Sequence, residues 1–333
     1  MLDIYTNIPA GLLDCDATQL HTVLKGPALI KLAGKREDIL FISVLLHGNE
    51  TTGWEAVRTL LSRYQMQALP RSLSIYIGNI AAARESQRCL PHQPDYNRIW
   101  KAEGTLPEHD MVRALFSELE GKPLFAAVDV HNNTGKNPHY ACVNRLESRF
   151  LHIARLFSRT VVYFIRPDTV MSMAMASRCP AVTIECGLPG EAKGVLHVLE
   201  FLDACLHLSE YPEHDIPAQD LDLFHTVATV KIAGNAHIGI ADWSADFSLL
   251  PDMDKLNFNE IPAGSLFGWA NGLDALPLLA WDEQGREIGR RYFEVQQNEI
   301  ITMMPVMPSM LTLDLNIIKQ DCLCYLMERL SVN

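Results

Sequence analysis

Side chains suited to metal binding and proton transfer follow a run of apolar residues near the start of the chain. The segment that begins at Asp38 is mainly apolar up to residue 46 and then continues as His47, Gly48, Asn49 and Glu50. An apolar run that ends in a polar cluster is typical of a buried strand whose carboxyl end opens into a site. Because His47 and Glu50 are three residues apart, both side chains can point the same way in a turn that enters a helix. We therefore expect this pair to bind the same metal ion.

Two later apolar runs end in groups of the same kind. Residues 124–131 end with Asp129 and His131, and residues 181–185 end with Glu185. The carboxyl ends of parallel strands lie along one edge of a sheet, where open α/β folds place their ligands. A single histidine at a strand end is more often structural, but several such groups on one edge favour a shared site.

His131 supplies the third ligand that His47 and Glu50 lack. Two histidines and one carboxylate form the ligand set of catalytic zinc, and three protein ligands leave one position for water. Zinc lowers the pKa of that water to about 7 and polarises a carbonyl oxygen. The sequence therefore predicts one Zn²⁺ per chain and the hydrolysis of an amide or ester bond.

Two carboxylates are expected to assist the metal ligands. Asp129 lies two residues before His131, on the same face of a strand, where a carboxylate can fix the tautomer of a ligand imidazole. Glu185 is expected to be partly buried and to carry a proton from metal-bound water to the leaving group. The structural alternatives are a surface or capping role for Asp129 and a buried ion pair with an arginine for Glu185.

A long polar segment, residues 80–107, contains Arg88, Asn97 and Arg98. Long loops inside a compact domain are usually functional. Guanidinium groups bind carboxylates with two parallel hydrogen bonds and can stabilise an oxyanion. We expect these three residues to contact the substrate, although arginines in a loop are often only solvated.

The elements that must position these residues follow an alternating pattern. The pattern predicts strands at residues 38–46, 73–77, 124–131, 160–165 and 181–185, and helices at residues 51–64, 108–120, 147–158 and 190–208. Nearly continuous apolar strands that alternate with helices indicate an α/β fold, with a mostly parallel sheet flanked by helices. Beyond residue 216 short alternating runs between glycines and prolines predict a smaller β-rich domain.

Composition restricts the class of protein. The 333 residues are 48% hydrophobic and 20% charged, which is typical of a globular chain. No apolar run is long enough for a membrane span and the first residues do not resemble a signal peptide, so we expect a cytoplasmic protein that binds no membrane. A net charge of −12 argues against nucleic acid as a partner. Of the eight cysteines, only Cys322 and Cys324 lie close enough for a shared ligand or redox pair, and packing is the alternative.

As a set, these motifs resemble the succinylglutamate desuccinylase and aspartoacylase family, a branch of the zinc carboxypeptidase-like metallohydrolases. The resemblance covers roughly residues 38–200 and rests on His47-Gly-Asn-Glu50, an arginine followed by Asn97-Arg98, Asp129-Val-His131-Asn132 and Ile184-Glu185-Cys-Gly187. It implies a catalytic domain at residues 1–215 and a C-terminal domain at residues 216–333. It also implies zinc on His47, Glu50 and His131, with Glu185 as general base and acid. Arg88, Asn97 and Arg98 would then surround the substrate carboxylate or the scissile carbonyl.

The sequence departs from this family at one substrate-binding position. Aspartoacylases carry an arginine ten residues before the catalytic glutamate, and Met175 stands there in this chain. Arg178 is a candidate substitute, and Tyr292 is a candidate for the tyrosine that a C-terminal domain often contributes to such pockets. The resemblance implies a small carboxylate-bearing substrate of the N-acyl amino acid kind, and the absence of this arginine argues against N-acetylaspartate and leaves the specificity among such substrates open.

Two other functions are weighed against this one. The same zinc chemistry would serve a metallocarboxypeptidase that acts on short peptides. A metal-free, inactive relative could act as a binding module, but His47, Glu50, His131 and Glu185 are all intact. Self-association into a homo-oligomer stays open.

Overall fold

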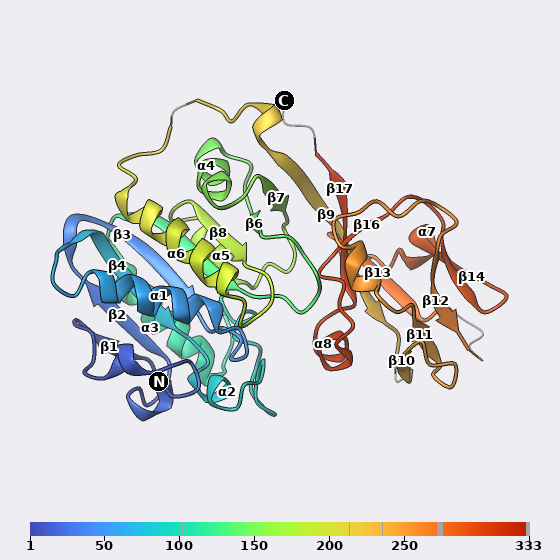
Figure 1. Ribbon diagram of the computed structural model, residues 1–333, viewed down its shortest axis with the longest axis horizontal. Coiled ribbons are helices and arrows are strands. Elements are labelled where there is room, and N and C mark those ends of the chain that lie inside the picture. Colours follow the sequence, from blue (N-terminus) through green and yellow to red (C-terminus); the bar gives the residue numbers. More distant parts are fainter. Residues whose placement is uncertain (102, 213, 235, 272–275, 331–333) are drawn as a thin grey trace. The chain divides into compact units, whose positions relative to one another are not determined.

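The computed structural model describes residues 1–101, 103–212, 214–234, 236–271 and 276–330. The chain divides into two compact units (Figure 1). The first contains Met1–Asn132 and His139–Asp222, and the second contains Asn133–Pro138 and the described residues from Leu223 onward. Within the described ranges, no helix has both the length and the apolar character needed to cross a membrane.

The first unit is built on a mixed sheet. Its strands, in sheet order, are β1 (Asp3–Tyr5), β2 (Ala28–Leu32), β4 (Leu69–Ile77), β3 (Gly34–Val44), β5 (Leu124–His131), β8 (Ala181–Glu185), β6 (Tyr140–Val143) and β7 (Thr160–Tyr163). The β2–β4 and β6–β8 pairs are antiparallel, and the other neighbours in this series for which a register is defined are parallel. This arrangement confirms the predicted α/β fold with a mostly parallel sheet.

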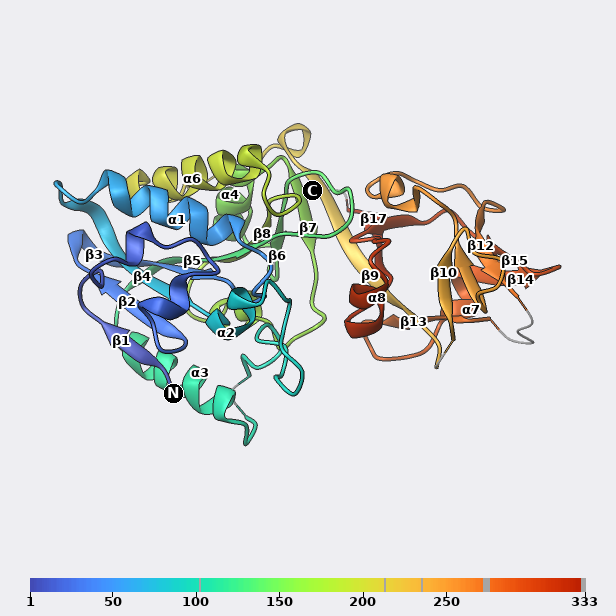
Figure 2. The ribbon, with the colours of Figure 1, turned by 60° about the horizontal axis from the view of Figure 1, so that its bottom comes forward.

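Helices cover both faces of this sheet. They are α1 (Thr52–Arg63), α2 (Ile80–Arg84), α3 (Pro107–Leu119), α4 (Ser148–Phe157), α5 (Met171–Met175) and α6 (Ala192–His207). Figure 2 shows α1, α4 and α6 above the sheet and α3 below it. In α1, the spacing of Trp54, Val57, Leu60 and Leu61 places them on one face, and all four are buried. Burial of such apolar faces on the sheet holds the layers together.

Three short elements differ from the sequence-based expectation. Residues 80–84 were expected to be loop but form α2, because the Asn79 side chain accepts a hydrogen bond from the Ala82 N–H at 3.1 Å and caps the helix. Strand β6 and helix α5 were not predicted. Strand β6 pairs antiparallel with β8, so it lies beside the strand that ends in Glu185.

The second unit is rich in β structure, as predicted. Strand β9 (Asp222–Ile232) pairs with β13 (Leu278–Asp282) and β17 (Cys324–Arg329), and β17 pairs with β16 (Met307–Ser309). A separate sheet has the order β10 (Ile238–Ile240), β11 (Phe247–Leu249), β12 (Leu266–Ala270), β15 (Glu299–Thr302) and β14 (Phe293–Gln296). The short helices α7 (Gly289–Tyr292) and α8 (Leu315–Gln320) complete it. Its own apolar core includes Phe247, Phe267 and Phe293, and Cys322 and Cys324 are both buried.

Candidate metal centre

The turn between β3 and α1 presents His47 and Glu50. Within it the N–H of Glu50 donates to the carbonyl oxygen of His47 at 3.1 Å, so the chain folds back and brings the two side chains together. Gly48 is required by close packing, because a Cβ atom there would lie 2.2 Å from the backbone nitrogen of Ala83 in α2. The N–H of Gly48 also donates to the carbonyl oxygen of Arg88 at 3.1 Å. The turn is thus fixed against the start of the 80–107 segment.

The register of the parallel strands brings the other groups to the same edge. Strand β5 lies between β3 and β8 in the sheet. Its Asp129 is opposite Ser43 of β3, and its His131 is opposite Glu185 of β8. The ends of three adjacent strands therefore supply the site, as the sequence pattern indicated.

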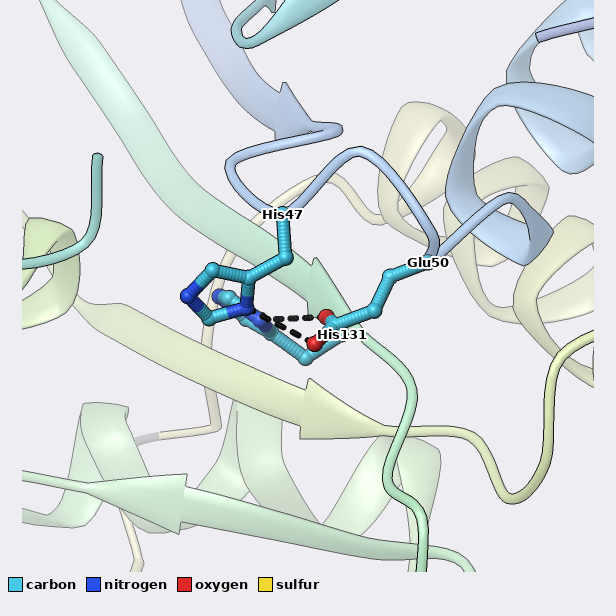
Figure 3. Close-up of side chains that lie close together, drawn as sticks. All are labelled: His47, Glu50 and His131. Atoms are coloured by element: carbon cyan, nitrogen blue, oxygen red, sulfur yellow. Dashed lines mark hydrogen bonds and ion pairs between the residues drawn. The ribbon is translucent and has the colours of Figure 1, made fainter. Parts of the chain in front are cut away.

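His47, Glu50 and His131 form a compact group (Figure 3). Each offers one ligand atom, and these three atoms all lie within 4.8 Å of one another. Nδ1 of His47 is 2.7 Å from Oε1 of Glu50, and Nδ1 of His131 is 2.7 Å from Oε2 of the same carboxylate. The three residues are only 4–6% exposed. Two imidazoles and a carboxylate that converge in a buried place match the donor set of a catalytic zinc site, so this group fits a metal ion.

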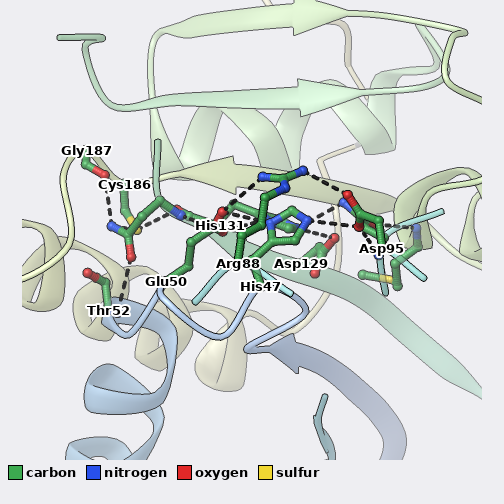
Figure 4. Close-up of polar contacts among 12 residues, drawn as sticks. His47, Glu50, Thr52, Arg88, Asp95, Asp129, His131, Cys186 and Gly187 are labelled. Carbon is green, nitrogen blue, oxygen red and sulfur yellow. Dashed lines mark hydrogen bonds and ion pairs between the residues drawn. The ribbon is translucent and has the colours of Figure 1, made fainter. Parts of the chain in front are cut away.

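The outer nitrogen of each imidazole lies against another carboxylate. Nε2 of His47 is 3.0 Å from Oδ1 of Asp95, and Nε2 of His131 is 2.8 Å from Oδ2 of Asp129 (Figure 4). A carboxylate in this position holds the proton on Nε2 and leaves Nδ1 as the donor to a metal ion. The arrangement therefore presets both histidines as ligands through the same ring atom.

Asn132 ties the ligand turn to two other segments. Its N–H donates to Oε2 of Glu50 at 3.1 Å, and its side-chain oxygen accepts from the N–H of Thr52 at 3.2 Å. Its Nδ2 donates to the carbonyl oxygen of Gly187 at 2.8 Å. These bonds fix the first residue of α1, the Glu50 carboxylate and the chain that follows Glu185 relative to one another.

The 80–107 segment brings Arg88, Asn97 and Arg98 toward the group. Nη2 of Arg88 is 2.9 Å from Oδ2 of Asp95, and its Nη1 is 3.7 Å from Oε1 of Glu50. Nδ2 of Asn97 is 3.2 Å from Nε2 of His131. Nη1 of Arg98 donates to the carbonyl oxygen of Asn97 at 3.0 Å. These cationic and amide donors therefore border the carboxylate-rich centre.

Glu185 is buried beside this group, with 7% of its surface exposed. Burial raises the pKa of its carboxyl to about 7, the nearby His131 opposes this shift, and the charge of Glu50 adds to it. Its Oε2 atom is buried and has no hydrogen-bond partner among the described residues. A carboxyl group with these properties can exchange a proton near neutral pH.

Glu50 and Asp95 behave in the opposite way. Burial alone would raise the pKa of Glu50, but the imidazoles of His47 and His131 outweigh it and lower that pKa. Burial also opposes ionisation of Asp95, yet His47, Arg88 and Arg98 hold its pKa well below the usual range. Glu50 and Asp95 are therefore carboxylates at neutral pH, whereas Glu185 is poised between its two states.

Arg178 is not brought together with these residues. Arg178 precedes the amino end of β8, whereas Glu185 lies at its carboxyl end, and the Arg178 guanidinium lies 4.7 Å from the ring centre of Phe116. Tyr292 lies in the apolar core of the second unit and is 3% exposed.

Met175 lies in α5, which meets the 80–107 segment. It is the last residue of that helix and is buried. The N–H of Met171, at the start of α5, donates to the side-chain oxygen of Asn97 at 3.1 Å. The helix that ends at Met175 is therefore hydrogen-bonded to the border of the centre.

Two residues of the centre were missed as site residues by sequence reasoning. Asp95 lies in the long loop, where the hydrophobic pattern does not predict where a side chain will be. Its place two residues before Asn97 was a usable signal. Asn132 was noted only as part of a motif, and its direct succession to His131 was the signal for its role.

Comparison with known proteins gives a match to one catalytic domain and several structures of similar fold. Residues 38–197 match the succinylglutamate desuccinylase/aspartoacylase catalytic domain. No curated protein matches by sequence. Among solved structures, succinylglutamate desuccinylase from Chromobacterium violaceum is 17% identical with a TM-score of 0.57, covering 90% of this chain and 87% of that one. Murine aminoacylase 3 is 14% identical with a TM-score of 0.56, covering 90% and 98%.

A third solved structure, the succinylglutamate desuccinylase/aspartoacylase from Rhodobacter sphaeroides, is 14% identical with a TM-score of 0.55, covering 90% of this chain and 88% of that one. At such identities the structural likeness establishes the fold, and the matched catalytic domain contains the His47–Glu50 turn, His131 and Glu185. Residues 38–197 therefore match the succinylglutamate desuccinylase/aspartoacylase catalytic domain, and the chain shares the fold of these solved structures.

Proposed function

We propose that this protein is a zinc-dependent hydrolase that cleaves an amide or ester bond in a small, carboxylate-bearing, N-acyl amino acid-like substrate. The observation that carries the proposal is the convergence of His47, Glu50 and His131, whose ligand atoms lie within 4.8 Å of one another. One Zn²⁺ per chain, bound there, would activate a water molecule and polarise the scissile carbonyl.

Glu185 is proposed as the general base and then the general acid. Its pKa of about 7 lets it accept a proton from water and return it to the leaving group within one catalytic cycle. Its Oε2 atom has no partner among the residues that the structure describes, and this supports the role, because a buried carboxylate oxygen without a partner is costly and would be satisfied by water or substrate.

Arg88, Asn97 and Arg98 are proposed to bind the substrate. The ion pair with Asp95 fixes one side of the Arg88 guanidinium, and the other side lies near Glu50. From this position Arg88 can donate hydrogen bonds to a developing oxyanion or to a substrate carboxylate. Arg178 lies at the opposite end of β8 and is left out of this proposal, whereas a contribution from Tyr292 stays a prediction.

The surrounding assignments stay proposals as well. We propose that residues 1–215 form the catalytic domain and that residues 216–333 form a C-terminal β-rich domain. A cytoplasmic location and zinc as the resident metal are likewise inferred from sequence and from the donor set. The names of the structural relatives, succinylglutamate desuccinylase and aminoacylase 3, support an acylated amino acid as the substrate class.

The decisive experiment combines metal analysis with a panel of N-acyl amino acids, dipeptides and simple esters. We expect about one zinc per chain and hydrolysis of one of the N-acyl amino acids. Preference for dipeptides would instead favour a carboxypeptidase. Absence of both bound metal and hydrolysis after zinc addition would leave only the inactive binding relative.

A pair of variants tests the assigned roles. Glu185→Gln keeps the shape of the side chain but loses the base, so it should retain zinc while turnover falls about 10²–10⁴-fold. His131→Ala removes a ligand and should lose both zinc and turnover. Retained turnover in Glu185→Gln would show that another group is the base.

A further inference from the structure

A polar cavity lies at the edge of the first unit's sheet opposite the metal centre. Its volume is about 250 Å³, and its wall includes Leu124 and Phe125 at the start of β5 and Pro180 just before β8. His131 and Glu185 are the last residues of the same two strands. At about 3.3 Å per residue, β5 separates this cavity from the metal centre by roughly 20 Å. The two places are therefore distinct.

Three arginines line this cavity: Arg145, Arg149 and Arg178. Arg145 forms an ion pair with Glu147 at 3.1 Å. Within the described part of the chain, neither Arg149 nor Arg178 has a carboxylate within ion-pair distance, and the Arg178 guanidinium is steadied by its contact with Phe116. Two arginines that line the cavity thus have no anionic partner among the described residues.

A fourth guanidinium lies behind the wall. Arg71 is fully buried, forms an ion pair with Asp38 and stacks over Phe125 with its central carbon 3.6 Å from the ring centre. Asp38 and Phe125 both line the cavity. Because Arg71 neutralises Asp38 and Arg145 neutralises Glu147, the charges of Arg149 and Arg178 stay uncompensated. The positive potential in this cavity is opposite in sign to the potential expected from the chain's net charge of −12.

Helix α4 adds to this positive potential. It spans ten residues, Ser148–Phe157, and its first turn carries Arg149 and Phe150, which both line the cavity. The amino end of a helix favours negative charge through its dipole and its unpaired N–H groups. Arginine side chains and the helix end therefore act on the same space.

We infer that this cavity is a binding site for a small dianion, either a phosphate group or a dicarboxylate, held by the Arg149 and Arg178 guanidinium groups. Both kinds of anion present oxygens at the spacing that a guanidinium fork binds with two hydrogen bonds. A monoanion would compensate only one of the two charges. The inference is independent of the hydrolysis proposed above, because it concerns binding about 20 Å from the metal centre.

Isothermal titration of the full chain with inorganic phosphate, succinate and acetate at constant ionic strength tests this site. We expect phosphate or succinate to bind more tightly than acetate. Which of the two dianions binds more tightly shows whether the site prefers a phosphate group or a dicarboxylate. In the double variant Arg149→Gln/Arg178→Gln, affinity should fall about tenfold or more, since two charge-assisted contacts are lost. Arg63→Gln/Arg290→Gln, which removes two exposed arginines outside the cavity, is the matched control and should bind as the parent does.

Two further measurements distinguish binding in this cavity from binding at the metal centre. Arg88→Gln alters the proposed substrate site and should leave the dianion affinity of the cavity unchanged. Hydrogen exchange should slow at residues 145–150 and 176–180 when the dianion binds. The inference is overturned if neither dianion binds more tightly than acetate, or if the Arg149→Gln/Arg178→Gln variant, shown to be folded by circular dichroism, binds as tightly as the parent.

Discussion

Both histidines of the centre turn the same ring atom toward Glu50. Nδ1 faces the shared carboxylate in His47 and in His131, and a carboxylate lies against each Nε2. Asp95 comes from a loop 48 residues beyond His47, whereas Asp129 lies two residues before His131 on the same strand. At the scale of single residues, the centre is thus two equivalent carboxylate–imidazole pairs around one further carboxylate.

This pairing predicts the effect of removing either outer carboxylate. Asp95→Asn and Asp129→Asn should each weaken zinc affinity by about 10–100-fold, because the imidazole loses the group that fixes its tautomer. Competition with a chromophoric chelator measures this. Asp95→Asn should also raise KM, because Asp95 holds Arg88 at 2.9 Å, whereas Asp129 makes no ion pair with an arginine among the described residues. The exposed Asp110→Asn is the control, and unchanged zinc affinity in both test variants would contradict the assignment.

The raised pKa of Glu185 predicts how activity depends on pH. Below its pKa of about 7 the side chain is protonated and cannot act as a base, so kcat/KM should increase as pH rises through that value. A cation bound nearby favours the carboxylate, so zinc should move this increase to lower pH. Initial rates across the pH range test this. A profile without an acidic limb would exclude Glu185 as the titrating base.

At the scale of elements, the turn between β3 and α1 is held by the close approach of α2. A Cβ atom on Gly48 would lie 2.2 Å from Ala83 N and 2.3 Å from Ala82 C, both backbone atoms that cannot rotate away. The ligand turn and the first helix of the 80–107 segment therefore form one packed unit.

Gly48→Ala should consequently destabilise the protein by about 1–3 kcal/mol, the usual cost of overpacking a dense interior. It should also lower zinc affinity, because His47 would move with the turn. Urea denaturation followed by circular dichroism gives the free energy of unfolding. Gly26→Ala is a fitting control, since nothing lies within 4 Å of a Cβ atom there. An equal free energy of unfolding in the two variants would show that α2 can shift to make room for the added methyl group without destabilising the protein.

The long, strongly patterned elements were predictable from sequence. Strands β5 and β8 begin and end where the apolar runs do, and α1, α3, α4 and α6 follow the spacing of their buried residues. These elements bury a continuous face or a whole strand, which is the feature that hydrophobic periodicity records. Their order also predicted that His47, Glu50 and His131 would meet, because parallel strands end at a common edge.

The short elements could not be predicted in the same way. Strand β6 has four residues and α5 has five, too few for a period to emerge. Helix α2 had a local signal in the Asn79 cap, which the surrounding polar sequence obscured. The position of Asp95 depends on how the loop that contains it packs against the ends of the strands. Tertiary contacts, rather than local pattern, therefore placed the part of the site that sequence missed.

At the scale of the whole molecule, metal binding should be visible in stability. A ligand that binds only the folded state stabilises it by about 2.7 kcal/mol at a free concentration one hundred times its Kd. Zinc should thus raise Tm of the parent protein, and a chelator should lower it again. Scanning calorimetry on the parent and on His131→Ala measures this, with no zinc-dependent shift expected in the variant. Equal shifts in both would place the stabilising ion elsewhere.

The distance along the chain between Glu50 and His131 gives the proposed ion a second consequence. The two residues are 81 positions apart, and α1, β4, α2 and α3 all lie between them. An ion held by both would act as a cross-link that closes this long loop, and such links oppose opening chiefly by restricting the unfolded chain. Amide exchange from this part of the chain would then report metal release, even in the absence of any substrate.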